Sequence, residues 1–191
     1  MASTANNAEN VSVGKGVAGG YMFVAPLGTA LPTDNTTELN AAFLNMGYLG
    51  DDGITFADSA DTETFQDMNG DTIETSSGAV EKTFTVVLRE IKKDTLAITR
   101  GTENVSDTAG MITAYDKGPS SEAHSVVFEL LLKNGRKWRR VGEQVKLGEL
   151  GDMTVVYSDL VGREITMSVS LGSTTGSYWV DYIVSTETEA E

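Results

Sequence analysis

The chain has 191 residues, with 28 acidic against 14 basic side chains, one histidine and no cysteine, and a formal net charge of −14 at pH 7. The lack of cysteine excludes disulfides, thiol nucleophiles and thiolate metal sites, and the negative charge argues against an unaided binder of duplex nucleic acid. No apolar run approaches the roughly 18 residues of a membrane-spanning helix, and the first residues lack a signal-peptide pattern. We therefore expect a soluble protein that is made in the cytoplasm and has no membrane partner.

The composition and length favour one β-rich domain. The 23 threonines and 18 valines are β-branched residues, which suit a pleated sheet, and 40% of the residues are apolar, enough for a packed core. We expect this domain to cover residues 19–185. A small, polar N-terminal arm (1–18) precedes it, and an acidic C-terminal tail (186–191) follows it.

The first elements predicted along the chain are a strand and a helix. The strand covers residues 21–25 and stops at Pro26. Asn35 is a good helix N-cap, Glu38 three residues later completes a capping box, and Gly47 supplies the end. Between them, apolar residues recur at the spacing of one buried helical face: Leu39, Ala42, Phe43 and Met46.

The next part of the chain predicts three strands and a second helix. Strands are expected at 48–56 and 72–75, separated by the acidic segment 57–71, which is a long loop or an extended hairpin. Apolar and polar residues alternate over 83–89 as in a half-buried strand. A second short helix is expected over 92–100, with Leu96 and Ile98 as the candidates for burial.

The clearest local pattern predicts a β-hairpin. Residues 125–132 alternate, and Asn134-Gly135 suits the two positive-φ positions of a type I′ turn. A two-residue turn sets three expected pairs: Lys133 with Arg136, Leu131 with Trp138, and Glu129 with Arg140. Further strands are expected at 164–171 and 178–184. The whole pattern predicts a mainly β fold, a sandwich or barrel with one or two short flanking helices.

The sequence offers little catalytic chemistry. It lacks a nucleophile elbow, a dinucleotide-binding glycine motif and a phosphate-binding loop. His124 has no nucleophile to activate and is read as a surface or edge-strand residue. Asp67 to Asp71 is read as a plain acidic turn, with a structural cation as the less favoured alternative, because the spacing is not that of a helix-loop-helix calcium site. We expect no enzyme activity and no cofactor.

The charges are segregated along the chain. Between Lys15 and Lys82 there is no basic residue, whereas 12 of the 14 bases lie from Lys82 to Lys146. Five of these bases form one cluster on the predicted hairpin: Lys133, Arg136, Lys137, Arg139 and Arg140. The cluster is either a solvated hairpin end or a contact with an acidic neighbour, and that neighbour could be another copy of this chain.

The sequence resembles the major tail proteins of bacteriophages with long, non-contractile tails. The resemblance runs in order from about Asn10 to Ile183 and is strongest in the first third. It is carried by the strings Val24-Ala25-Pro26-Leu27-Gly28-Thr29-Ala30-Leu31-Pro32-Thr33-Asp34, Leu39-Asn40-Ala41-Ala42-Phe43 and Gly47-Tyr48-Leu49-Gly50-Asp51-Asp52-Gly53-Ile54-Thr55. The chain departs from some relatives at Met68-Asn69, where an aromatic residue is common, and it lacks an added immunoglobulin-like domain.

The resemblance implies a tail-tube subunit located in the virion. In this family, hexameric rings stack into a hollow tube, sheets of neighbouring subunits join around the lumen, and viral DNA passes through without specific binding. It also implies a tape-measure protein and tail terminator or tip proteins as partners. The N-terminal arm is then expected to be disordered in the monomer and ordered on assembly. A net charge of −14 fits a lumen that repels DNA phosphates.

Two sets of residues follow as candidate sites. We expect the basic cluster to meet the acidic segment 57–71, an inter-ring loop, on an adjacent subunit; the acidic partners are Asp58, Asp61, Glu63, Asp67 and Asp71. Charge reversal at Arg139 and Arg140 is then expected to abolish tubes while leaving a folded monomer. Four acids of the flanking strands are the candidate lumen lining: Asp51, Asp52, Glu74 and Glu81.

A β-sandwich module that binds carbohydrate or adheres to a phage or cell surface is the alternative function. Such modules usually display an aromatic platform, for which Trp138 and Trp179 are the available tryptophans. An enzyme ranks third, because no nucleophile and base can be paired.

Overall fold

The computed structural model describes residue 6 and residues 8–185, and most of its regular structure is strand, which confirms the mainly β class. The expected C-terminal tail, 186–191, lies outside the described residues. The elements are β1 (Lys15–Gly16), β2 (Met22–Pro26), β3 (Leu44–Asn45), β4 (Leu49–Gln66), β5 (Thr72–Leu88), α1 (Lys93–Arg100), β6 (Val105–Thr108), β7 (Met111–Ala114), β8 (Ala123–Leu131), β9 (Lys137–Leu150), β10 (Arg163–Ser170), β11 (Val180–Ile183) and the 3₁₀ turns Ala8–Asn10, Thr102–Asn104 and Lys133–Gly135.

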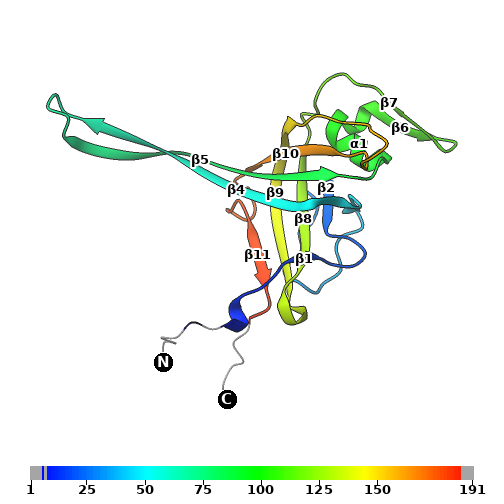
Figure 1. The fold of residues 1–191 in the computed structure, drawn as a ribbon, viewed down its shortest axis with the longest axis horizontal. Coiled ribbons are helices and arrows are strands. Elements are labelled where there is room, and N and C mark those ends of the chain that lie inside the picture. Colours follow the sequence, from blue (N-terminus) through cyan, green and yellow to red (C-terminus); the bar gives the residue numbers. More distant parts are fainter. Residues whose placement is uncertain (1–5, 7, 186–191) are drawn as a thin grey trace, which may run out of the picture.

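Most strands belong to one antiparallel sheet with the order β3-β2-β8-β9-β10-β5-β4, to which β1 is added beside β8 and β11 beside β9. β6 and β7 form a separate pair next to α1. Figure 1 shows β4 and β5 crossing the body and continuing far beyond it as a two-stranded projection. β4 is the last strand of the order, so its outer edge has no partner within the described part of the chain.

The core is built from alternating residues of β2, β5, β8 and β10. Met22, Phe84, Phe128 and Met167 are fully buried. The ring of Phe128 lies edge-on to Phe84, with 5.1 Å between ring centroids, and edge-on to Phe56 at 5.3 Å, an arrangement that aromatic pairs favour. The alternation seen in the sequence therefore predicts the buried side of these strands correctly.

The helix expected over residues 35–46 is wrong: this segment consists of turns followed by β3. The Asp34 carboxylate accepts the backbone N–H groups of Thr36 and Thr37, both at 2.6 Å. The Arg139 guanidinium donates to the carbonyls of Asp34 (2.8 Å) and Thr37 (2.9 Å), and a helix beginning at Asn35 would need the Thr37 carbonyl for its own hydrogen bonds. Two of the apolar residues are nevertheless buried in this loop: Phe43 and Met46.

The second predicted helix is confirmed as α1, and Gly101 follows it with φ at 91°. Ile98 is buried and Leu96 is half-buried. The β6–β7 pair that follows was not predicted. Its eight residues are mostly exposed, so the sequence carries no alternation of apolar and polar residues at this point.

The hairpin of β8 and β9 is confirmed, but its register differs by one residue from the prediction. Asn134 (φ 61°) and Gly135 (φ 75°) have the expected left-handed backbone. However, the Leu132 amide donates to the Arg136 carbonyl at 2.8 Å, so Leu132 rather than Lys133 lies opposite Arg136. One more residue in the turn shifts every pair. The observed pairs are Leu131 with Lys137, Leu130 with Trp138, Glu129 with Arg139, and Phe128 with Arg140.

Glu143 of β9 ties the turn between β10 and β11 to the sheet. Its buried carboxylate accepts the backbone N–H groups of Thr174 (2.9 Å) and Thr175 (2.8 Å) and the Ser173 hydroxyl (3.0 Å). Burial acts to raise its pKa, but the hydrogen bonds from Thr175 and Thr174 outweigh it and lower the pKa to about 2. The folded state therefore stabilises the ionised carboxylate of Glu143 more than the unfolded state does.

We expect Glu143→Gln to lower the free energy of unfolding at pH 7 by about 1–3 kcal/mol. Because the folded pKa of Glu143 lies below its usual 4.5, this contribution is complete above about pH 5 and is lost as the pH falls toward 2. Urea titrations of both proteins at pH 7, 4 and 3 measure it. A difference between them that stays constant over this range would contradict the assignment.

Candidate assembly surfaces

The acidic segment 57–71 is a strand and a turn rather than a loop. β4 pairs with β5 from Asp58 opposite Lys82 out to Gln66 opposite Thr72, so the extended-hairpin alternative is confirmed. We call residues 57–81 the projecting hairpin. Of its side chains that the structure describes, all but the half-buried Asp67 are exposed, and none belongs to the core. The projecting hairpin thus offers both its faces and its outer edge to other molecules.

The tip of the projecting hairpin is a tight turn organised by Asp67. Its carboxylate accepts the backbone N–H groups of Asn69 (2.8 Å) and Asp71 (2.9 Å), and these bonds lower its pKa. The turn leaves Met68 almost fully exposed, at 98%. The carboxylate is therefore engaged in shaping the turn, as the reading of a plain acidic turn predicts.

The predicted acidic residues are spread along the projecting hairpin and its base. Asp58 binds Lys82 at 2.6 Å within the chain. Asp51 and Asp52 lie in a bulge at the base of β4, where Arg89 approaches Asp51 to 3.7 Å. Asp61 lies in β4, and its side chain is outside the described ones. The others are exposed: Asp52, Glu63, Asp71, Glu74 and Glu81.

One face of the sheet carries small hydroxylated side chains. On β5 and β10 these residues alternate with the buried core residues, and the hydroxyls of Thr85 and Thr166 lie 2.8 Å apart. The same face carries the carboxylates of Glu81 and Glu164 and, on the neighbouring β9, the exposed Lys146 opposite Ser168. Its other residues are Thr55, Ala57, Ser59, Thr83, Thr85, Val87, Thr166, Ser168 and Ser170. Sequence reasoning did not single this face out, although the alternation of Ser and Thr along two strands was a visible signal.

The basic cluster does not act as one surface. Arg139 is buried and its guanidinium binds Glu129 (2.7 Å from Nε) besides the two carbonyls of the 34–37 turn. Arg140 forms two hydrogen bonds to Asp181, at 2.8 and 2.9 Å, and lies 4.5 Å above the Phe56 ring. Arg136 donates to the Ser12 hydroxyl at 3.0 Å. The structure thus assigns contacts within the chain to three arginines, while two lysines are exposed: Lys133 and Lys137.

The described part of the N-terminal arm lies against this hairpin. β1 pairs with the end of β8, with Lys15 opposite Leu131, and the Val17 amide donates to the Glu129 carbonyl at 3.2 Å. Residues 1–5 and 7 of the arm lie outside the described residues. The expectation of an arm that is loose throughout the monomer is therefore wrong from Ser12 to Val17.

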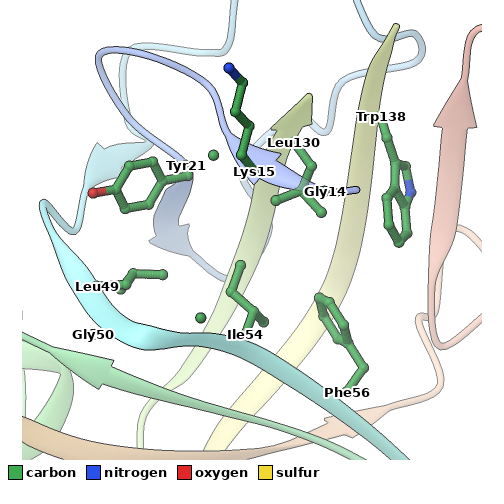
Figure 2. A pocket seen from close by; sticks show the side chains of 11 residues that line it. Gly14, Lys15, Tyr21, Leu49, Gly50, Ile54, Phe56, Leu130 and Trp138 are labelled. Atoms are coloured by element: carbon green, nitrogen blue, oxygen red, sulfur yellow. The ribbon is translucent and has the colours of Figure 1, made fainter. Parts of the chain in front are cut away.

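Two grooves flank β1. Figure 2 shows one of about 470 Å³ between β1 and β4, where Tyr21, Ile54, Phe56, Leu130 and Trp138 form apolar walls and the Lys15 side chain extends away from them. The second, of about 430 Å³, lies on the other side of Lys15, between residues 11–13 and the turn from β8 to β9. Both are open surface features.

His124 is not on the surface. It lies in β8 opposite Pro26 of β2 on one side and Val145 of β9 on the other, and it is only 8% exposed. Burial lowers its pKa, and the nearby Glu122 carboxylate partly opposes this effect. The edge-strand reading of this residue is therefore wrong, since β8 is an internal strand.

Comparison with known proteins identifies the family. The sequence profile described as "Phage tail tube protein" matches residues 4–186. No curated protein matches the sequence. Among solved structures, the chain is similar to one titled "Cryo-EM Structure of an Extracellular Contractile Injection System, PVC sheath-tube complex in extended state", with 12% identity, a TM-score of 0.39, and 86% of this chain and 89% of that chain covered. That likeness is too weak to carry an argument. Among the described residues no helix is long and apolar enough to cross a membrane. The family profile covers nearly the whole chain, and the chain therefore belongs to the phage tail tube proteins.

Proposed function

We propose that six copies of this chain close into a ring and that the rings stack into a hollow tube through which viral DNA enters the host. As a member of its family the chain is a structural subunit of a phage tail tube, not an enzyme, and a component of the virion. The observation that carries the proposal is the unpaired outer edge of β4, continued by the exposed projecting hairpin. The unpaired N–H and C=O groups of an open strand edge can pair with a strand of another chain. In a closed ring every subunit's open edge can be paired with its neighbour.

The hydroxyl-rich face of β5 and β10 is the surface best suited to line the lumen. It is mostly polar, and its charged side chains are Glu81, Glu164 and, on the adjacent β9, Lys146. Carboxylates on this face repel DNA phosphates, so DNA slides past without a specific site. Of the four lumen residues expected from the sequence, Glu81 fits this surface. The others remain part of the proposal on the same charge argument: Asp51, Asp52 and Glu74.

Contacts between copies are proposed to pair opposite charges. The acidic side of the contact is the projecting hairpin, which carries no base between its first residue and Glu81. The basic side is proposed at Lys133 and Lys137, because these two side chains are exposed, whereas Arg139 is buried and Arg136 and Arg140 are half-buried. Pairing of opposite patches offsets the mutual repulsion of subunits that each carry −14.

The resemblance to long, non-contractile phage tails extends the proposal to partners. A tape-measure protein would occupy the lumen before DNA, and terminator and tip proteins would cap the two ends of the tube. Synthesis would take place in the cytoplasm of the bacterial host. The adhesive alternative receives no support from the aromatic residues, because Trp179 packs against Phe56 and Phe84 instead of forming a platform.

Self-assembly of the purified protein tests the proposal. Size-exclusion chromatography over a range of concentrations, followed by negative-stain electron microscopy, is expected to show rings and then tubes as the concentration rises. Image classification of end-on views reports the number of subunits. A protein that remains monomeric at several milligrams per millilitre, with its fold verified by circular dichroism, would sink the proposal.

A further inference from the structure

The groove beside the turn from β8 to β9 combines apolar walls with positive charge. Its lining includes Val13, Leu131 and Leu132 and two lysines, Lys15 and Lys133, and none of the described residues that line it is a carboxylate. Val13 is 86% exposed. The volume of about 430 Å³ can take several side chains. The groove therefore suits a segment that is apolar at its centre and acidic around it.

The tip of the projecting hairpin has the complementary composition. Met68 is 98% exposed, and Ile73 and Phe65 behind it are 70% and 47% exposed. Asp67 and Asp71 flank the methionine at the two ends of the turn. A large apolar side chain exposed at the end of a projecting hairpin, with acids around it, is typical of an anchor that is buried on binding.

We propose that the tip of the projecting hairpin of one copy docks into this groove of a second copy, with Met68 inserted between Val13 and Leu132. This inference rests on the proposed function, because it specifies one contact of the tube. The tip cannot fill the groove of its own chain, since Figure 1 shows it projecting away from the end of the molecule that carries β1. Asp71 then faces Lys15, which supplies charge complementarity across the contact. The flexible thioether side chain of methionine adapts to an irregular apolar wall.

The neighbouring groove of Figure 2 is a poorer receptor for the same tip. Two of its lining residues, Gly50 and Gly53, bracket the exposed carboxylates of Asp51 and Asp52. Asp67 and Asp71 would approach those carboxylates and be repelled. Charge thus distinguishes between two grooves of similar size.

Cysteine cross-linking tests the contact. Because the chain has no native cysteine, only the introduced cysteines can form a disulfide. Two single variants, Met68→Cys and Val13→Cys, are mixed, assembled and oxidised. A disulfide requires the two Cβ atoms to lie about 4 Å apart, so we expect a 68–13 linked dimer, identified by peptide mapping. The matched control pairs Val13→Cys with Met111→Cys, an exposed methionine at the end of another hairpin, and should give no such product.

The outcomes separate this inference from the proposed function. Tubes that form without the 68–13 product would overturn the docking and leave the tube intact. Failure of the wild-type protein to assemble at all would overturn the proposed function.

Substitution gives a second, quantitative measure. Met68→Ser should raise the protein concentration at which tubes form at least about tenfold, whereas Met111→Ser should leave it within about twofold. Asp71→Lys and Lys15→Glu should each weaken assembly, and mixing the two should restore part of it, because one contact of the pair regains opposite charges. Unchanged tube formation by Met68→Ser and by both charge variants would also overturn the docking.

Discussion

Replacement of Arg139 by methionine is expected to lower the free energy of unfolding by about 3–5 kcal/mol. Arg139 is only 4% exposed, and its guanidinium donates to the Glu129 carboxylate and to the carbonyls of Asp34 and Thr37. Its removal leaves a negative charge and two carbonyls with little water to solvate them, and releases the 34–37 turn. Chemical denaturation monitored by tryptophan fluorescence measures the loss.

Lys137→Ala on the same strand is the control, because Lys137 is exposed and surface substitutions usually change stability by less than 0.5 kcal/mol. Equal stability of Arg139→Met and the wild type would show that the buried pair is energetically neutral. The result also bears on assembly experiments. Charge reversal at Arg139 and Arg140 was expected to spare the monomer, but both arginines hold it together, so Lys133 and Lys137 are the informative positions.

Shortening the projecting hairpin is expected to abolish tubes while leaving the monomer folded. Ser59 and Glu81 face each other across the ladder, so residues 60–80 can be replaced by Asn-Gly without changing the register. The removed residues are exposed wherever described, apart from Asp67, and contribute nothing to the core. Electron microscopy should then show no tubes at concentrations at which the wild type assembles.

The control for this deletion is the fold of what remains. The aromatic cluster of Phe56, Phe84, Phe128 and Trp179 lies outside the deleted segment, so its near-ultraviolet circular dichroism should be unchanged, and the free energy of unfolding should stay within about 1 kcal/mol. Tube formation by the shortened chain would show that the projecting hairpin is dispensable. Loss of the near-ultraviolet signal would show that it supports the body of the protein.

The assembly surfaces were only partly predictable from the sequence. The acidic character of 57–71 and the exposure of Lys133 and Lys137 followed from composition and turn chemistry. The contacts of Arg139 and Arg140 could not be predicted in the same way. Their partners are Asp34, Glu129 and Asp181, which are distant in sequence or shifted in register. The groove beside β1 could not be anticipated at all, since it needs the N-terminal arm to lie along β8.

What the sequence by itself determined is the class of the fold, the buried side of the central strands, the β8–β9 hairpin and the family. These depend on side-chain alternation, on Asn134-Gly135 and on contiguous motifs, all of which act over a few residues. Only the tertiary structure decided the register of that hairpin, the absence of a helix over 35–46 and the extension of 57–71 into strands. The register changes because the turn holds one more residue than the two expected. In the other two cases a contact outside the segment outweighs local preference: Arg139 binds the Thr37 carbonyl, which a helix would use, and β5 pairs with the acidic segment and makes it a strand.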